Sequence, residues 1–259
     1  MRPYTIEKTT GTNPMTAIPK VRDLTEDSLD YLEAMTCFHH TNYGTDAFLN
    51  GLNLERVQFE ALKFAYPESK IEYRRGSNQV GTDIVIDDER VSTKSGLEGA
   101  GCIRVSSSTT KGLSGWAARD YLASGHQDGI FFSSHSKTGR ILDRSSWEYT
   151  WAVNYKIGYI DGPSMDEAIL NADHKEVKSS GDTYFHNYGE NMKIRIRENC
   201  SVDLWLDHSI LGKVLRQFTA YQDPVSKIWK TTNPRIEFSS AMSVFSPSLH
   251  LKGVNQATA

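Results

Sequence analysis

The stretch that decides the fold runs from Gly81 to Gly96 and reads GTDIVIDDERVSTKSG. Ile84-Val85-Ile86 before Asp88-Glu89 and Val91-Ser92-Thr93 after it are rich in β-branched residues, which is typical of two strands joined by a turn. With Asp88-Glu89 as a two-residue turn, Asp83 faces Lys94 across the hairpin. Successive side chains of a strand point to opposite faces, so one face carries Asp83, Val85, Ser92 and Lys94. The other, mostly apolar face carries Ile84, Ile86, Val91 and Thr93.

A carboxylate beside an amine on one sheet face is suited to metal-assisted hydrolysis. Asp83 can hold a divalent ion that polarises a phosphoryl oxygen and lowers the pKa of a bound water. Lys94 can orient or deprotonate that water and offset negative charge in the transition state. The other interpretation is a cross-strand ion pair on a solvated face, worth about 0–1 kcal/mol. Both interpretations are open from the pair alone.

A helix beginning near Asn53 precedes these strands. Its apolar positions fall on one face, and Pro67 ends it. Glu60 lies at the edge of that face, one turn after Arg56, so it can point toward the sheet and supply a second acidic ligand. An exposed helix glutamate is the alternative. The apolar positions are Leu54, Val57, Ala61, Leu62 and Ala65.

The order of these features, over about residues 53–135, resembles the PD-(D/E)XK nuclease superfamily, which includes most type II restriction endonucleases. Gly81-Thr82-Asp83 stands where Pro-Asp is usual, and Ser92-Thr93-Lys94 stands in place of the (D/E)XK triplet. The resemblance implies that Asp83 bridges Mg²⁺, that the Thr93 carbonyl is a further ligand, and that Lys94 is the catalytic lysine. Glu60 matches the helix glutamate that many members use.

Ser92 departs from the family pattern, because it replaces the second acid. A hydroxyl can bind a metal or hold a ligand water, but it removes one negative charge. Glu60, and after it Glu98, are the residues that could compensate. The resemblance implies a Mg²⁺-dependent type II restriction-like endonuclease that cuts double-stranded DNA at a short specific sequence. A weak or inactive DNA-binding protein of the same fold is the alternative.

Two later segments carry residues suited to DNA contacts. A segment dense in hydroxyls follows the hairpin, with basic residues around it; hydroxyls, lysine and backbone N–H groups bind phosphates. Further on, a basic and an apolar face alternate over 192–197, preceded by Tyr184 and His186, which can stack on or read bases. A surface loop and a protected edge strand are the alternatives. The predicted DNA contacts are Arg104, Ser107, Thr109, Lys111, Arg119, Lys193, Arg195 and Arg197.

The rest of the pattern predicts an α/β or α+β fold with a central mixed sheet flanked by helices, in a single domain over 1–259. Residues 136–259 are expected to complete the sheet and contact DNA. Strands are expected at 130–132, 147–160 and 192–197, with one or two more in 225–251. Helices are expected from a Thr25 cap to Met35, and at 116–123, 164–170 and 204–218.

Three competing sites have weaker support. Cys37, His39 and His40 could bind zinc, but no second ligand pair follows. Asp173-His174 with Asn187 loosely resembles an HNH nuclease motif, without the surrounding pattern. Ser92 and Lys94 could form a nucleophilic dyad, but nothing signals an oxyanion hole.

Composition bounds the function further. The 259 residues are 38% hydrophobic and 24% charged with a net charge of −3, which excludes a disordered chain and one that is basic throughout. No apolar stretch approaches a membrane span, and the N-terminus has no signal-peptide pattern. Three separated cysteines suggest reduced thiols. We expect a cytoplasmic protein, a homodimer matched to a palindromic site, no membrane contact and no nucleotide cofactor.

Overall fold

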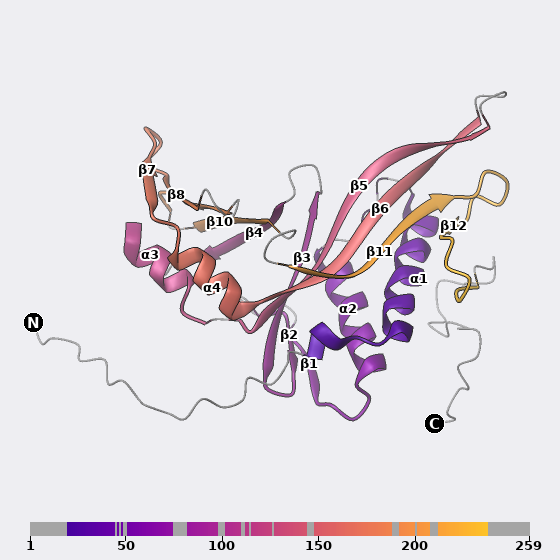
Figure 1. The fold of residues 1–259 in the computed structure, drawn as a ribbon, viewed down its shortest axis with the longest axis horizontal. Helices are drawn as coiled ribbons and strands as arrows, with labels where there is room; N and C mark the ends of the chain where they lie inside the picture. Colours follow the sequence, from indigo (N-terminus) through magenta and orange to yellow (C-terminus); the bar gives the residue numbers. More distant parts are fainter. Residues whose placement is uncertain are drawn as a thin grey trace, which may run out of the picture.

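The computed structural model describes residues 20–44, 46, 48, 51–74, 82–97, 102–109, 112–113, 115–125, 127–143, 148–187, 192–199, 201–207 and 212–237. Four α-helices occur in these parts, after a short 3₁₀ turn at Lys20–Asp23 (Figure 1). They are α1 (Glu26–Tyr43), α2 (Gly51–Ala65), α3 (Gly115–Leu122) and α4 (Gly162–Leu170). Thr25 caps α1 as predicted, with its hydroxyl accepting from the N–H of Ser28, but the helix continues eight residues beyond Met35 to Tyr43.

The strands form two sheets, which confirms the α+β class and the mixed sheet. The larger sheet has seven strands in the order β1-β2-β3-β5-β6-β11-β12, and β3 and β5 are its parallel pair. The second sheet has five antiparallel strands in the order β4-β10-β9-β8-β7. The bounds are β1 Ile71–Tyr73, β2 Ile84–Ile86, β3 Glu89–Leu97, β4 Cys102–Thr109, β5 Gly129–Asp143, β6 Glu148–Asp161, β7 His174–Val177, β8 Thr183–Asn187, β9 Met192–Ile196, β10 Ser201–Asp207, β11 Lys213–Gln222 and β12 Trp229–Lys230.

The β2–β3 hairpin differs from the predicted register. Its turn lies at Asp87–Asp88, so Ile84 pairs with Val91 and the predicted pairing of Asp83 with Lys94 is wrong. Asp87 adopts a φ of 51°, a left-handed conformation that aspartate tolerates better than most residues. The shift amounts to two residues on β3. Because side chains alternate with a period of two, the predicted grouping of side chains on each face survives the shift.

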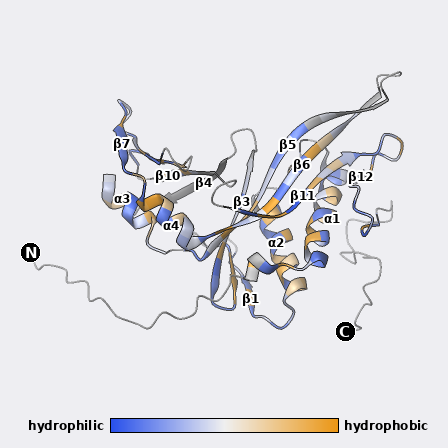
Figure 2. Ribbon diagram, in the orientation of Figure 1, coloured by the Kyte–Doolittle hydropathy of each residue, from blue (hydrophilic) through white to orange (hydrophobic). Residues whose placement is uncertain are grey.

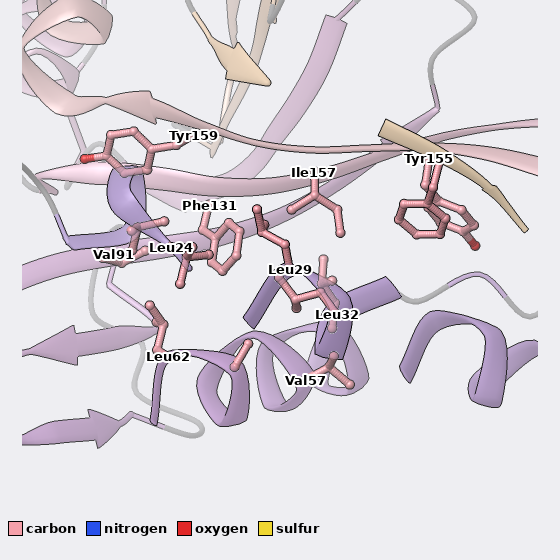
Figure 3. Packing of buried hydrophobic residues seen from close by; sticks show 14 of the residues in the cluster. Leu24, Leu29, Leu32, Val57, Leu62, Val91, Phe131, Tyr155, Ile157 and Tyr159 are labelled. Carbon is pink, nitrogen blue, oxygen red and sulfur yellow. The ribbon is translucent and has the colours of Figure 1, made fainter. Parts of the chain in front are cut away.

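Both faces of the larger sheet are buried against other elements. Leu62 of α2 packs with Val91 and Phe131 in one cluster (Figure 3), and the orange apolar sides of α1 and α2 lie against this face (Figure 2). Ile130 and Phe132 belong to a second cluster, with residues of α3, α4, β8, β9 and β10. The sheet is therefore a central layer, with α1 and α2 on one face and α3, α4 and the second sheet on the other.

The predicted helix over 204–218 is wrong. The chain forms β10 and then β11 there, separated by residues 208–212. β10 is held between β9, the preceding strand in the chain, and the distant β4, and β11 lies against the distant β6, so each strand has a partner far away in sequence. The predicted strand near 130 and the helices at 116–123 and 164–170 are confirmed as β5, α3 and α4. No helix within the described ranges is long and apolar enough to cross a bilayer.

A buried histidine links α1 to the larger sheet. Nδ1 of His40 lies 3.0 Å from the carbonyl of Gly44, and Nε2 lies 2.5 Å from the hydroxyl of Tyr155. A carbonyl only accepts, so Nδ1 donates and the neutral Nε2 accepts from Tyr155. The ring also stacks on Trp229, with centroids 4.5 Å apart. Burial lowers the pKa of His40 below its ordinary 6.5.

We expect the His40 ring to make the protein less stable in acid. The unfolded chain binds a proton at this ring more readily than the folded chain, so the free energy of unfolding falls as pH drops through about 6.5 and below. Urea unfolding at about pH 7.5 and about pH 5 measures the effect, which should shrink in His40→Gln. His174→Gln, at an exposed histidine, is the matched control. Equal pH dependence of His40→Gln and the wild type would contradict the assignment.

Candidate active site

Asp83 lies directly before β2 with its main chain held on both sides. Its N–H donates to the carbonyl of Val91 at 3.0 Å, and its carbonyl accepts from the N–H of Arg74 at 3.0 Å. These bonds tie Asp83 to β3 on one side and to the end of β1 on the other. The carboxylate therefore projects from a backbone position that two neighbouring segments determine.

Three donors converge on one carboxylate oxygen of Asp83. Oδ2 accepts from the hydroxyl of Ser92 at 3.0 Å, from the main-chain N–H of Thr93 at 2.7 Å and from Nζ of Lys94 at 3.3 Å. All three donors come from consecutive residues of β3. The structure thus brings Asp83, Ser92, Thr93 and Lys94 into one cluster, as the sequence predicted.

The cluster lies where β2 stops pairing with β3. The last β2–β3 pair is Ile84 with Val91. Beyond it, the N–H of Thr93 donates to the Asp83 side chain instead of to the backbone of a further β2 residue. The N–H and C=O of one strand residue point to the same neighbour, so the Thr93 carbonyl lies at the same edge of β3. On its other edge β3 pairs with β5.

The charged groups of the cluster are more exposed to solvent than the Ser92 hydroxyl. Ser92 is fully buried, whereas the Asp83 and Lys94 side chains are 26% and 23% exposed. Solvent can therefore reach both charges but not the serine hydroxyl. Lys94 can donate to a water or a phosphoryl oxygen, and Asp83 can accept a proton or bind a cation. The buried Ser92 hydroxyl, already donating to Asp83, does not form an accessible nucleophile with Lys94.

Glu60 is not brought into this cluster. α2 packs on the opposite sheet face, and Glu60 lies 3.6 Å from Lys63 of the same helix. Burial, and then the charge of Glu60, raise the pKa of Tyr31 in α1 to about 12. The Glu60 carboxylate therefore faces the α1 side of α2.

Glu55 is the acid of α2 that the structure ties to the strands near Asp83. The Tyr73 hydroxyl donates to Oε2 of Glu55 at 2.9 Å. Tyr73 pairs with Ile84, the residue that follows Asp83. Tyr73 packs against the α1–α2 cluster, so Glu55, like Glu60, lies on the sheet face opposite Asp83.

The metal-ligand set at the cluster is small. Within the described ranges, no three acidic, histidine or cysteine side chains are placed to hold one ion. Mg²⁺, however, is commonly held by one or two carboxylates together with waters and substrate phosphates. One carboxylate, the Thr93 carbonyl and a phosphate from the substrate fit that pattern.

The acids of α1 form a separate cluster that cations already satisfy. Arg216 of β11 reaches Glu26 at 2.7 Å, Asp30 at 3.1 Å and Glu33 at 3.4 Å. Burial raises the pKa of Glu33. These contacts attach α1 to β11, and their chemistry is that of a structural ion-pair network.

The predicted DNA contacts fall into three groups. Arg104, Ser107 and Thr109 belong to β4, but their side chains, and all of Lys111, lie outside the described residues. Arg119 donates to the carbonyls of Leu170 and Ala172, at 3.2 and 3.1 Å, where α4 ends. That guanidinium therefore joins α3 to α4. Lys193, Arg195 and Arg197 form the third group.

The basic side of β9 is confirmed. Met192, Ile194 and Ile196 are buried, and the basic residues between and after them are partly exposed. Arg195 and Arg197 both donate to Oδ2 of Asp203, at 3.0 Å from Nε of Arg195 and 2.7 Å from Nη2 of Arg197. Asp203 thus offsets part of the positive charge on the side of β9 that the sequence analysis predicts to contact DNA.

The competing sites are used in other ways. Among the described residues, His40 bonds to Tyr155 and Gly44, and no zinc-binding group forms with Cys37. His174 pairs with His186 across the β7–β8 ladder.

No protein-family profile matches the chain, and no curated protein or solved structure is significantly similar to it.

Proposed function

We propose that the protein is a Mg²⁺-dependent DNA endonuclease with a restriction-endonuclease-like core. The observation that carries the proposal is the convergence of Ser92, Thr93 and Lys94 of one strand on the Asp83 carboxylate. The order of α2, β1, the β2–β3 hairpin and then α3, with β4 between the hairpin and α3, supports the resemblance to the PD-(D/E)XK nucleases. A simple ion pair between Asp83 and Lys94 would not need two further donors, a buried serine hydroxyl and a backbone N–H, on the same carboxylate oxygen.

Lys94 acts on the attacking water and on the scissile phosphate. Its ammonium, held 3.3 Å from Asp83, orients the water and offsets the charge that develops on the phosphoryl oxygens. The water loses one proton to solvent as its oxygen forms a bond to phosphorus, the bond to the leaving oxygen breaks, and the leaving oxygen takes up one proton from solvent. Ser92 and the Thr93 N–H keep the Asp83 carboxylate in place during this exchange.

Asp83 and the Thr93 carbonyl would hold Mg²⁺. Ser92, expected from the sequence to be a ligand or water holder, is buried and donates to Asp83, so its role is to position that carboxylate. When bound, the ion supplies positive charge that polarises a phosphoryl oxygen and lowers the pKa of a water. Because the site contributes a single carboxylate among the residues described, the substrate phosphate has to complete the ligand set. Metal affinity is therefore expected to be weak without DNA.

A DNA-binding protein without catalysis is the second candidate function. It is favoured by Ser92 in place of the second acid and by the position of Glu60 on the helix that covers the sheet face opposite Asp83. On this proposal Asp83 and Lys94 neutralise each other. Duplex DNA is the partner in both cases, and a homodimer would match a palindromic site.

Incubation of the purified protein with unmethylated phage DNA distinguishes the two functions. Discrete fragments with Mg²⁺, and none with a chelator, support the endonuclease. A gel shift without cutting supports the binding protein. If the protein neither cuts nor shifts the DNA, both proposals are wrong.

Replacing the two acids of α2 separately tests whether either one serves the site. Both lie on the helix that packs on the sheet face opposite Asp83: Glu55 accepts from Tyr73, which packs against the α1–α2 cluster, and Glu60 contacts Lys63. We therefore expect Glu55→Gln and Glu60→Gln each to cut at near wild-type rate. The rate of supercoiled-plasmid cleavage measures both. A loss of about tenfold or more in Glu60→Gln would restore Glu60 as the second acid.

A further inference from the structure

The second sheet has one buried and one polar face. Phe185, Met192, Ile194, Val202 and Leu204 point into the cluster shared with α3 and α4. The sheet lies above α3 and α4 in Figure 1, so its opposite face is turned away from both helices. We call that opposite face the stacking face; its central residues are Tyr184, His186, Lys193, Arg195 and Trp205.

Strand register places aromatic and cationic residues side by side on the stacking face. One row runs His186, Lys193, Trp205 across β8, β9 and β10, and the next runs Tyr184, Arg195, Asp203. Neighbouring strands lie about 4.8 Å apart, so each cation touches a ring. All of these residues except the buried Asp203 are partly exposed.

The ring contacts confirm this interleaving. Nζ of Lys193 lies 4.9 Å from the ring centre of Tyr184 and 5.2 Å from that of Trp205. The guanidinium of Arg195 lies 5.7 Å from the Trp205 ring. Tyr184 and His186 are stacked with an interplanar angle of 11°. Two ring systems thus flank a line of positive charge.

The charge of the stacking face exceeds what its carboxylates offset. Arg195 and Arg197 share one oxygen of Asp203, whose side chain is 3% exposed. Two guanidinium groups against one buried carboxylate leave one positive charge, and Lys193 adds another. Glu176 of β7, which pairs with Tyr184, is itself offset by Lys178. Each guanidinium has five N–H groups, so donors remain beyond those that Asp203 takes. Asp203 therefore acts as a positioning residue for a pair of phosphate-binding forks.

We propose that the stacking face binds an unpaired stretch of nucleic acid, with bases on the Trp205 and Tyr184 rings and phosphates at Lys193, Arg195 and Arg197. A duplex hides the faces of its bases, whereas single strands expose them to aromatic side chains. This inference deepens the proposed function: the DNA that is cut carries a single-stranded tail or opening beside the duplex. β3, which carries Lys94, leads along the chain into β4, the strand that pairs with β10.

The test is fluorescence anisotropy of labelled oligothymidylate with the full-length protein in a chelator, so that no cutting occurs. We expect Trp205→Leu and Tyr184→Leu each to weaken binding about 5-fold or more, which corresponds to the loss of one stacked base. Tyr184→Phe, which keeps the ring, should bind as the wild type does. Affinity should also fall as salt rises.

Trp151→Leu is the matched control. Trp151 of β6 is 40% exposed and also lies under a lysine, with Nζ of Lys137 4.2 Å from its ring centre, but it belongs to the other sheet. Its replacement should leave oligothymidylate binding unchanged. Circular dichroism of each variant shows whether it is folded, and Tyr184→Phe against Tyr184→Leu carries the test if Trp205→Leu does not fold.

Three outcomes overturn the stacking face as the site: no binding of oligothymidylate by the wild type, equal loss in Trp151→Leu, or unchanged binding in both Trp205→Leu and Tyr184→Leu. Tighter binding of blunt duplex than of oligothymidylate also contradicts it. Cleavage is scored separately. If binding depends on the rings but the protein does not cut DNA in Mg²⁺, this inference stands and the endonuclease proposal is wrong. If the protein cuts DNA and both leucine variants bind oligothymidylate normally, the endonuclease proposal stands and this inference is wrong.

Discussion

Lys94→Ala is expected to lower the rate of DNA cleavage about a hundredfold to ten-thousandfold while leaving specific DNA binding nearly unchanged. The ammonium of Lys94 lies 3.3 Å from Asp83 and is 23% exposed, so it can reach the reacting phosphate. Its charge is needed most in the transition state, when negative charge builds on the phosphoryl oxygens. Single-turnover cleavage and a gel shift in Ca²⁺ measure the two properties separately.

The control for this change is a second lysine on the other side of the sheet. Lys63 of α2 lies 3.6 Å from Glu60 and is half exposed, so Lys63→Ala removes a similar charge from the opposite face. It should cut at the wild-type rate. Cleavage by Lys94→Ala at that same rate would show that Lys94 serves only as a partner for Asp83.

Asp83→Asn should abolish cleavage, because it removes the one carboxylate of the cluster. It should also cost about 1–3 kcal/mol in the free energy of unfolding. The asparagine oxygen can take the place of Oδ2 and accept from the same three donors, but it carries no negative charge to offset the Lys94 ammonium. Plasmid cleavage, urea unfolding and calorimetry of Mg²⁺ binding in the presence of uncleavable DNA follow the three consequences.

The Asp46–Lys137 pair supplies the comparison for Asp83→Asn. Asp46 is 81% exposed and lies 2.7 Å from Lys137, so it is an aspartate–lysine pair without buried donors around it. Asp46→Asn should change the unfolding free energy by about 0–1 kcal/mol and leave cleavage intact. Normal Mg²⁺ affinity in Asp83→Asn would place the ion elsewhere in the protein.

The hairpin could be predicted well because its information is local. The alternation from Ile84 to Lys94 assigns side chains to two faces, and an error of two residues in register does not change that assignment. The same reasoning predicted α2, α3 and α4, whose apolar spacing or first-turn residues are contained within each segment.

Segments whose structure depends on distant partners were predicted poorly. Residues 204–218 contain enough apolar residues to suggest a helix, but β10 is stabilised by the distant strand β4, and β11 by the distant strand β6. Arg119 was predicted to contact DNA, but its guanidinium donates to the carbonyls of Leu170 and Ala172 at the end of α4.

The sequence by itself determined that Asp83, Ser92 and Lys94 share one face of a hairpin, because the two-residue period of a strand is a property of the backbone. It equally determined that β9 is basic on one side and apolar on the other. Only the tertiary structure decided that β2 stops pairing at Ile84, which lets one oxygen of Asp83 collect three donors. It also decided that Glu55 rather than Glu60 is tied to the strand beside Asp83, and that Trp205 lies next to Lys193. Such contacts depend on how helices and strands far apart in the chain pack together, and no local period encodes that packing.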